Sequence, residues 1–590
     1  MTELAADTLL AGLDPEQREV ALATRGAVCV LAGAGTGKTR AITHRIAYAA
    51  AIGVVNPAHV LALTFTVRAA GELRGRLREL GAAQVRASTF HAAALRQLNY
   101  FWPRVVGGRP PQLISAKAAL IREAAKQARL HLDGPGLADA ASEIEWAKTT
   151  QVRPDGYARA AAAAGRSPDL GADAVALVYD GYERLRRERH QIDFESVLEL
   201  TAAIVLEHRG AADQVRDTFR YFVVDEYQDV NPLQKLLLDA WLGDRDDLCV
   251  VGDPRQVIYS FTGATPDYLT GFAAEFPGAT LVRLVRDYRS TPQVVAVANQ
   301  LIRSGPALVA QQPPGPRPVL TRYADDASEA AGVAISIRAL IAAGVPAREI
   351  AVLVRINADT ERFEQALAQA EVPYVVRGAE RFYERPVVRQ ALVLFRGAAR
   401  GAAASPASPA SPASAASPDG PEGQEPLPSA VRHVLTGIGF TGSPAQTPAG
   451  GSPARERWES LAALAQLADD MYATRPQASL GDFAAELTQR ADLGHAPSAE
   501  GVTLASMHSA KGLEWDAVLL PGLVEGLLPI VHARTPEAIE EERRLLYVAV
   551  TRARQHLYLS WSPARAPGGQ GRGAARARSR FLDDVRLGRR

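Results

Sequence analysis

A glycine-rich run that ends in lysine and threonine is the first pattern in this chain that could do chemistry. It reads A-G-A-G-T-G-K-T, follows an apolar run typical of a buried parallel strand (Val28–Leu31), and precedes a helical pattern (Arg40–Tyr48). In this context glycines let backbone N–H groups converge on phosphate oxygens at the start of a helix. Lys38 could neutralise the β- and γ-phosphates, and the Thr39 hydroxyl could bind Mg²⁺. The residues expected to cradle a phosphate group are Ala32, Gly33, Ala34, Gly35, Thr36, Gly37, Lys38 and Thr39.

Ala32 stands where the strict phosphate-loop pattern has glycine, so a glycine-rich turn without a ligand is the alternative. A second pattern favours the chemical interpretation, because Asp225 and Glu226 end an apolar, strand-like run. Asp225 could hold Mg²⁺ through its water shell, and Glu226 could orient or deprotonate an attacking water. A carboxylate pair after a strand can also be a simple turn, but a phosphate loop earlier in the same chain favours hydrolysis.

The composition is that of a globular protein with several domains. A length of 590 residues allows roughly three or four of them. Sixty-six basic residues against 65 acidic ones give a net charge of +1, so local patches would have to hold any nucleic acid. Only six residues are lysine, and Lys38 and Lys511 stand in G-K-T and A-K-G-L-E contexts that favour a compact point charge. Cys29 and Cys249 lie in apolar runs and are expected to be buried thiols.

The N-terminus has no basic leader, and no apolar run approaches the ~18 residues of a membrane span. We therefore expect a soluble, cytoplasmic protein without a membrane partner.

Short apolar strands alternate with helical patterns, which predicts an α/β fold. A helix is expected to begin near Leu13, with Asp14 as its N-cap and Pro15 in its first turn. An Ala-, Arg- and Glu-rich stretch over residues 95–190 has helical periodicity without a strand signal, so it predicts an all-helical insertion. A second α/β unit is expected to begin near Leu281. Strands are predicted at 28–31, 60–64, 85–91, 222–225, 248–252, 319–323, 350–354, 374–376, 502–506 and 517–520, and a basic helix at 67–80.

Three further segments interrupt or follow the α/β pattern. Residues 401–428 repeat Ser-Pro-Ala and are predicted to be a disordered linker. A helical segment is expected at 458–493. The Gly- and Arg-rich tail from about Ser562 is expected to be mobile.

Five segments of the chain together resemble the helicase motifs of the UvrD/Rep/PcrA family of superfamily 1. The resemblance extends from Leu13 to about Trp561. It implies two RecA-like P-loop domains with parallel sheets, each interrupted by a helical insertion. The matching segments are D-E-Y-Q-D (225–229), V-G-D-P-R-Q-V-I-Y-S-F-T-G-A (251–264), D-Y-R-S-T (287–291), T-L-A-S-M-H-S-A-K-G-L-E (503–514) and E-E-R-R-L-L-Y-V-A-V-T-R-A (541–553).

The resemblance implies domain boundaries and an activity. The first RecA-like domain would span 1–95 and 193–280, with a helical insertion at 96–192. The second would span 281–395 and 500–561, with a reduced insertion at 396–499 and a tail at 562–590. The implied activity is that of a bacterial ATP-dependent DNA helicase that moves 3′ to 5′ in repair or replication. Implied partners are ATP, Mg²⁺, single-stranded DNA and its junctions with duplex, for a nucleoid-associated protein that is monomeric or self-associates weakly.

The same resemblance assigns residues to the nucleotide, which would lie between the two domains. Gln17 would read the adenine edge, and Arg40 and Tyr288 would contact the base. Gln256 would sense the γ-phosphate, and Glu514 would bond the ribose. Arg289 and Arg552 would stabilise the charge that develops on the γ-phosphoryl group.

For single-stranded DNA the resemblance indicates aromatic, threonine and histidine positions. Aromatic faces stack bases without reading sequence, although a single aromatic residue is more often part of a core. The chain departs from the usual motifs at Arg68, at Pro254–Arg255 and at Phe261–Thr262, where relatives have a Trp-Arg pair. The expected DNA contacts are Thr64, Phe65, Thr89, Phe90, His91, Tyr259, Phe261 and His508.

Three other functions fit parts of the pattern. One is a translocase that strips proteins from DNA and unwinds weakly. A second is a DNA-binding scaffold with an impaired ATPase, which the intact Lys38, Asp225, Glu226 and Arg552 argue against. A third is a P-loop enzyme such as a nucleotide kinase, which the motifs after Asp225 disfavour.

Overall fold

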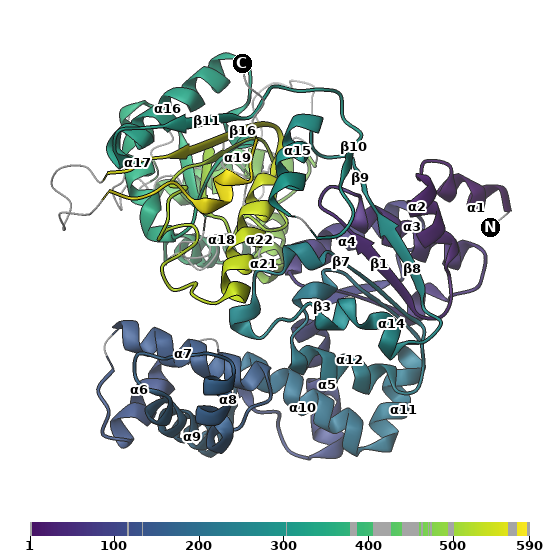
Figure 1. The fold of residues 1–590 in the computed structure, drawn as a ribbon. Coiled ribbons are helices and arrows are strands. Elements are labelled where there is room, and N and C mark those ends of the chain that lie inside the picture. Colours follow the sequence, from purple (N-terminus) through teal and green to yellow (C-terminus); the bar gives the residue numbers. More distant parts are fainter. Residues whose placement is uncertain are drawn as a thin grey trace, which may run out of the picture. The chain divides into compact units, whose positions relative to one another are not determined.

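The chain forms two compact units, each built on its own parallel sheet (Figure 1). One unit comprises Met1–Arg289 and Ile302–Gln312, and the other comprises Ser290–Leu301 and Pro313–Arg590. The computed structural model describes residues 3–114, 117–132, 134–302, 304–377, 386–404, 426–438, 440, 460–461, 464–465, 467–469, 471–472, 475–493, 501–564 and 575–586. No described helix is long and apolar enough to cross a membrane.

The first unit contains a six-stranded sheet in the order β3-β2-β6-β7-β1-β8, and all its strand pairs are parallel. The five strands predicted in this part of the sequence are present. The second unit is expected to begin near Leu281, but β8 at this position pairs with β1 along its whole length and so belongs to the first sheet. The strands are β1 (Val28–Ala32), β2 (Val60–Thr64), β3 (Arg86–Thr89), β6 (Tyr221–Val224), β7 (Leu248–Gly252) and β8 (Thr280–Leu284).

Helices cover both faces of this sheet, as the uninterrupted apolar strands require. Alternate strand residues enter two cores, with Leu61 and Leu63 in one and Val60 and Ala62 in the other. Cys29 and Cys249 are buried thiols, one in each core, as predicted. One core includes α2 (Pro15–Leu22), α3 (Lys38–Ala51) and α4 (Val67–Glu79), and the other includes α5 (Phe90–Val105), α10 (Phe194–Glu207), α11 (Arg209–Thr218) and α12 (Pro232–Leu242).

The helical insertion has its own core, formed by α6 (Ala118–Gln127), α7 (Gly134–Thr149), α8 (Tyr157–Ala163) and α9 (Ala172–Glu188). Its predicted start at residue 96 falls inside α5, whose Leu98 belongs to the sheet's core, so the insertion starts later. The expectation of no strand here is also wrong. A two-residue strand, β4 (Gln112–Leu113), pairs in parallel with β5 (Gln191–Ile192), and two residues are too few for a detectable apolar pattern.

The second unit has a parallel sheet in the order β11-β16-β15-β12-β14-β13. The five strands predicted after residue 318 are present, but β16 was not expected. Its first residues include Arg554 and His556, so it lacks a continuous apolar run. The strands are β11 (Val319–Arg322), β12 (Ile350–Val354), β13 (Tyr374–Arg377), β14 (Val502–Ser506), β15 (Trp515–Leu520) and β16 (Ala553–Trp561).

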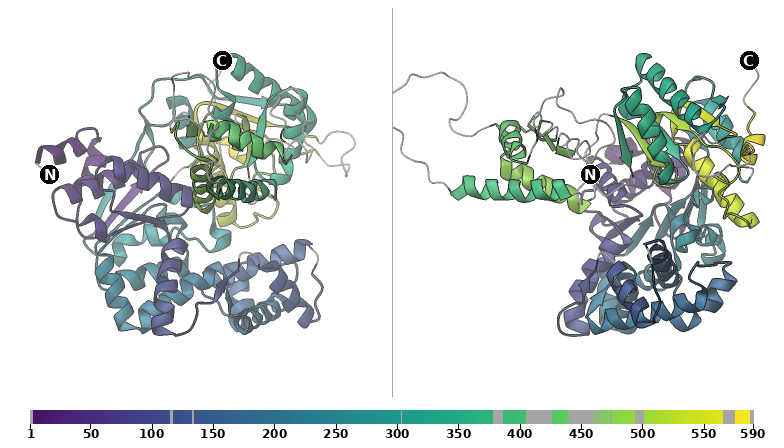
Figure 2. Two further views of the ribbon diagram at one scale, coloured as in Figure 1. Left: turned by 180° about the vertical axis from the view of Figure 1, so that it is seen from behind. Right: turned by 90° about the vertical axis from the view of Figure 1, so that its left-hand side faces the viewer.

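Three further helices of this unit share a separate core (Figure 2, green). They are α18 (Pro386–Ala404), α19 (Leu427–Thr436) and α21 (Leu480–Leu493). The predicted linker at 401–428 is therefore wrong at both ends, because residues 401–404 complete α18 and 427–428 begin α19. Residues 405–425, the Ser-Pro-Ala repeats, lie outside the described residues. The predicted helix at 458–493 is confirmed over α21.

The C-terminal tail is ordered where the structure describes it. Phe581 is fully buried in the short helix η10 (Arg580–Asp583). Arg580 pairs with Glu525 at 2.6 Å, and Arg543 pairs with Asp584 at 2.6 Å. The prediction of a mobile tail is wrong for residues 575–586, because one aromatic side chain and complementary charges secure it.

Candidate nucleotide and nucleic-acid sites

The carboxyl edge of the first sheet collects most of the predicted site residues, as expected for a parallel α/β sheet. The order of the strands places Phe65 after β2, the carboxylate pair after β6, Asp253 after β7 and the phosphate loop after β1. Strands lie roughly 5 Å apart, so the ends of β2 and β1, three strands apart, are separated by about 15 Å. Phe65 and the phosphate loop therefore lie toward opposite ends of the carboxyl edge of the sheet, and the carboxylates lie between them.

The phosphate loop has the backbone shape that its glycines predict. Gly35 and Gly37 have φ values of 69° and 77°, and α3 begins at Lys38 directly after Gly37. The buried Thr36 closes the loop, because its hydroxyl donates to the carbonyl of Gly33 at 2.9 Å. A Cβ at Gly35 would lie 2.5 Å from the Asp287 carboxylate. The loop thus cannot accept a side chain there, and its N–H groups stay at the start of a 14-residue helix.

The residues assigned to the base lie around the start of α2. The Gln17 side chain is buried and donates to the carbonyl of Thr36 at 3.0 Å. Arg40 donates to the carbonyl of Gly12 at 2.7 Å, and the Tyr288 hydroxyl donates to Asp14 at 2.6 Å. Burial and the hydrogen bond to Asp14 raise the pKa of Tyr288 to about 12. Asp14 and Pro15 start α2 as predicted. Gln17 and the backbone N–H of Tyr288 both contact the phosphate loop, and Arg40 directly follows it.

Asp225 and Glu226 directly follow β6. Asp225 is buried, and desolvation together with the Glu226 carboxylate raises the pKa of Asp225 well above its ordinary range, while the positive charge of Lys38 opposes this rise. Two carboxylates in such surroundings favour a bound cation. Glu226 has a left-handed backbone, with φ of 52°, which is uncommon for a residue with a side chain.

Gln228 fixes this arrangement and was not singled out from the sequence. It is fully buried, and its Nε2 donates to the Glu226 carboxylate at 2.5 Å. Its Oε1 accepts from the backbone N–H of Asp253 at 3.0 Å. Gln256 in turn donates to the Asp253 carboxylate at 2.9 Å. One chain of contacts therefore joins the predicted water-orienting carboxylate to the predicted γ-phosphate sensor.

Asp253 and Asp287 are further buried carboxylates, and no role for them is predicted from the sequence. Arg255, where the chain departs from the usual motif, pairs with Asp253 at 3.1 Å and donates to the carbonyl of Pro306 at 3.0 Å. Asp287 accepts from the backbone N–H of Arg289 at 2.8 Å. Both acids hold backbone segments beside the phosphate loop, and their side chains help to place Arg255 and Arg289.

In the second unit, Arg552 and Glu514 lie at connected positions. Arg552 is almost fully buried and donates to the carbonyls of Val548 at 2.9 Å and Leu513 at 3.2 Å. Glu514, the next residue, pairs with Arg554 at 3.0 Å. Arg554 also pairs with Glu349 at 2.8 Å and with Asp516 at 3.1 Å, so it holds the predicted ribose-binding carboxylate in place.

Three aromatic side chains of the first unit form what we term the aromatic row: Phe65, Tyr259 and Phe261. The rings of Phe65 and Tyr259 stack with centroids 5.7 Å apart and planes 14° apart. Phe261 follows at 6.1 Å from Tyr259. Phe65 is 42% exposed and Phe261 is 48% exposed. Exposed rings in a row offer faces on which bases could stack.

Other predicted DNA contacts are placed differently. Phe90 is only 4% exposed and stacks on Trp241 within the core, so the prediction that it contacts DNA is wrong. Thr89 accepts from the backbone N–H of Ala92 at 3.2 Å as the N-cap of α5, and Thr64 is buried at the end of β2. Their contacts with DNA stay predictions.

The two predicted histidines are half-buried and uncharged near neutral pH. Burial and the positive charge of Lys117 lower the pKa of His91 to about 4. Burial and the positive charge of Arg355 lower the pKa of His508 to about 4. In the chain without DNA both imidazoles are therefore neutral at pH 7.

Comparisons with known proteins agree with this geometry. The profile of the UvrD/REP helicase N-terminal domain matches residues 13–277, and that of the UvrD-like helicase C-terminal domain matches residues 282–403 and 432–564. The chain therefore belongs to the UvrD/REP helicase family, and its class is that of ATP-hydrolysing DNA helicases. The match to the two profiles also identifies the two sheets as RecA-like P-loop domains.

Three relatives show the range of similarity. The chain is 50% identical over 606 aligned positions to the ATP-dependent DNA helicase UvrD2 of Mycobacterium tuberculosis, covering 99% of this chain and 83% of that protein. It is 30% identical to UvrD1 of the same organism, over 98% and 86% of the two chains. It is 27% identical to the ATP-dependent DNA helicase PcrA of Staphylococcus epidermidis, over 98% and 87%.

Proposed function

We propose that this family member couples ATP hydrolysis to 3′-to-5′ movement along single-stranded DNA and unwinds duplex at junctions. The observation that carries this proposal is the shared sheet edge. At one end of this edge, the phosphate loop has no room for a side chain at Gly35. At the other end, the exposed ring of Phe65 stacks on Tyr259. Direction, the preference for junctions and a place in repair or replication rest on the resemblance to the family alone.

In this proposal the nucleotide lies on the phosphate loop. Backbone N–H groups of Gly33–Lys38 and the Lys38 ammonium hold its phosphates, and Gln17, Arg40 and Tyr288 hold the base. Mg²⁺ fits the residues at this site, because the Thr39 hydroxyl and the buried Asp225 carboxylate would supply the oxygen ligands that this ion prefers. The ion would neutralise charge on the phosphates.

Hydrolysis is assigned to residues that touch the water or the γ-phosphoryl group. Glu226 orients the attacking water and accepts its proton, and its carboxylate is steadied by Gln228. Gln256 senses the γ-phosphate, and the chain Gln256–Asp253–Gln228–Glu226 relays its position to the carboxylate. Arg289 and Arg552 stabilise charge on the γ-phosphoryl group, and Glu514 bonds the ribose.

Single-stranded DNA is assigned to the aromatic row, with Thr64, Thr89, His91 and His508 as further contacts. Stacking on these rings does not depend on base identity, which suits a motor that must move along any sequence. The proposal includes a cytoplasmic, nucleoid-associated protein that works as a monomer or a weakly associated one.

One experiment tests the proposal. ATP turnover is measured with and without single-stranded DNA, beside strand separation on duplexes with a 3′ or a 5′ tail. We expect DNA to stimulate turnover and the 3′-tailed duplex to be separated faster. Stimulated turnover without strand separation would favour a translocase that displaces proteins. Absence of turnover with intact DNA binding would identify a scaffold.

A further inference from the structure

The backbone of the loop that carries Phe261 is held by the helical insertion. Ser260–Thr262 form one turn, η5, which ends at Gly263 in a left-handed conformation with φ of 91°. The Phe261 ring itself is 48% exposed. The position of this ring therefore depends strongly on what holds its backbone.

Thr149, the last residue of α7, makes the first of these contacts. Its hydroxyl oxygen lies 2.8 Å from the carbonyl oxygen of Thr262 and 3.0 Å from that of Trp146, and the residue is 6% exposed. A Cβ at Gly263 would lie 3.1 Å from this hydroxyl oxygen and 2.9 Å from the methyl group of Thr150. The end of α7 and the loop are thus packed closely enough to exclude a side chain at Gly263.

Arg166, which follows α8, makes the second contact. Its Nη1 donates to the carbonyl of Phe261 at 3.3 Å, while Nε and Nη2 donate to the Glu143 carboxylate at 2.9 Å and 2.7 Å. The guanidinium lies 4.6 Å from the Trp146 ring centroid. The loop residues Ile258–Ala264 include no arginine. The positive charge next to this backbone is that of Arg166, which its contacts with Glu143 hold in place.

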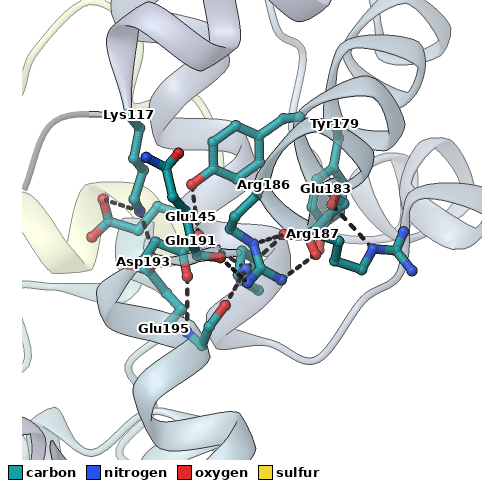
Figure 3. Close-up of polar contacts among 12 residues, drawn as sticks. Lys117, Glu145, Tyr179, Glu183, Arg186, Arg187, Gln191, Asp193 and Glu195 are labelled. Carbon is teal, nitrogen blue, oxygen red and sulfur yellow. Dashed lines mark hydrogen bonds and ion pairs between the residues drawn. The ribbon is translucent and has the colours of Figure 1, made fainter. Parts of the chain in front are cut away.

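The insertion is itself fixed at the same place. Lys148, next to Thr149, is buried and pairs with Glu183 at 2.7 Å and Asp193 at 2.9 Å. The surrounding network includes Lys117 with Glu195 at 2.6 Å and Arg186 with Glu183 at 2.6 Å (Figure 3). Buried ion pairs of this kind favour one arrangement of the insertion, because separating the partners leaves a buried charge without compensation.

We propose that Thr149 and Arg166 are positioning residues for single-stranded DNA: the helical insertion sets the place of Phe261 through two backbone carbonyls. This inference rests on the proposed DNA-binding role of the aromatic row. Its consequence is specific, since loss of either contact weakens DNA binding without removing any group that touches nucleotide or base.

The test uses the full chain and a matched pair of substitutions. Thr149→Val removes the hydroxyl at nearly constant volume. Thr150→Val makes the same change one residue on, just after α7, where the hydroxyl donates to carbonyls within α7 and not to the loop: Trp146 at 2.7 Å and Ala147 at 3.3 Å. Thr149→Ser keeps the hydroxyl, and Arg166→Lys keeps the charge while removing the fork that spans Glu143 and Phe261.

Two quantities are measured for each variant: the Kd for a fluorescent oligo-dT, and the dependence of ATP turnover on its concentration. For Thr149→Val we expect binding about two- to ten-fold weaker, the size of one lost hydrogen bond. The half-saturating DNA concentration rises by the same factor, while the maximal rate at saturating DNA stays within about two-fold. Arg166→Lys behaves similarly. Thr150→Val and Thr149→Ser match the parent in both measurements.

The failures are distinguishable. A parent that does not bind oligo-dT overturns the proposed function and this inference with it. If the parent binds but Thr149→Val and Thr150→Val bind alike, this inference alone is overturned. A fall in maximal rate with unchanged Kd also overturns it. Thermal melting of each variant separates loss of binding from loss of folding.

Discussion

The two ends of one sheet edge differ in how they are specified. At the phosphate end, distant Gln17 and Tyr288 contact the contiguous residues 32–39, and the loop's glycines pack against neighbours that exclude a Cβ. At the aromatic end, exposed Phe65 and Phe261 flank the half-buried Tyr259, but Phe90 belongs to the core. Eight contiguous residues fix the loop's backbone geometry, whereas each ring's exposure depends on its tertiary neighbours.

This difference implies separable losses. Changes at the phosphate end should remove turnover and leave DNA affinity intact, and changes at the aromatic end should do the reverse. The contacts of Gln228 with Glu226 and Asp253 lie between them, in the segments that follow the central strands β6 and β7. A substitution at either end that lowered both ATP turnover and DNA affinity would show that the two ends are not independent.

The largest expected effect is that of Lys38→Ala. The loop would lose its ammonium group, the compact cation directed at the phosphates, so we expect ATP turnover to fall by about 10²–10³-fold or more. Steady-state hydrolysis with saturating oligo-dT measures it. Lys126→Ala, at an exposed position on α6, is the control and should keep the parental rate. Parental turnover in Lys38→Ala would contradict the assignment of the phosphate loop.

Gln228→Met should have the next largest effect. The substitution keeps most of the volume but removes the side-chain hydrogen bonds to Glu226, Asp253 and Asp229, so Glu226 loses its support. Misplacing a reacting group by about 1 Å can cost about 10²-fold, and we expect kcat to fall about 10–100-fold with an unchanged KM for ATP. The control for loss of a partly buried amide is Gln97→Met on α5. It removes the oxygen that accepts a hydrogen bond from the Trp241 indole. A change in KM alone would give Gln228 a role in binding rather than in positioning.

Much of the fold could be predicted because its strands are short apolar runs that end in polar residues. The loop at 32–39 and the pair Asp225–Glu226 could be found for the same reason, since their geometry follows from adjacent residues. The exceptions have physical causes. Strand β16 starts with charged and polar residues, so its sequence does not indicate a strand. Strand β8 lies at a sheet edge and is partly exposed, so its sequence does not indicate which sheet it joins.

The unpredicted site residues share another property: each acts through a partner far away in the sequence. Gln228 contacts Asp253, Asp287 packs under Gly35, and Arg554 holds Glu514. The tail is ordered for the same reason, because Arg580 forms an ion pair with Glu525, 55 residues earlier in the chain. Only tertiary structure shows such pairs, although the Gln in D-E-Y-Q-D lies within a recognised motif and could have been singled out.

Phe261→Ala and Phe90→Ala together sharpen the comparison within the aromatic end. Phe261→Ala should weaken single-stranded DNA binding by about 1–3 kcal/mol, the size of one lost base stack. Phe90→Ala should leave the Kd of the folded protein near the parental value and lower the free energy of unfolding by about 3–5 kcal/mol. Oligo-dT titration and denaturant unfolding measure the two quantities. Reversed outcomes would place Phe90 at the DNA and Phe261 in the core.

The smallest effect at neutral pH is expected at His91, on the aromatic side. Its pKa is lowered to about 4 in the folded chain by burial and by Lys117, against about 6.5 for an unfolded chain. Above pH 6.5 the imidazole is neutral in both states and contributes nothing to the pH dependence. Between pH 6.5 and 4 the unfolded state binds the proton first, so the free energy of unfolding falls as the pH falls, by up to about 3 kcal/mol.

His91→Gln should therefore lose less stability than the parent between pH 6.5 and 4, while DNA affinity near pH 7 shows no step from this imidazole. His131→Gln, at an exposed position in the insertion, controls for removal of a histidine from the same unit. Denaturant unfolding at several pH values measures the slopes. Equal slopes for parent and His91→Gln would mean that His91 titrates normally in the folded chain. In that case it could meet DNA as a cation at mildly acidic pH, and the aromatic end would carry charge as well as stacking faces.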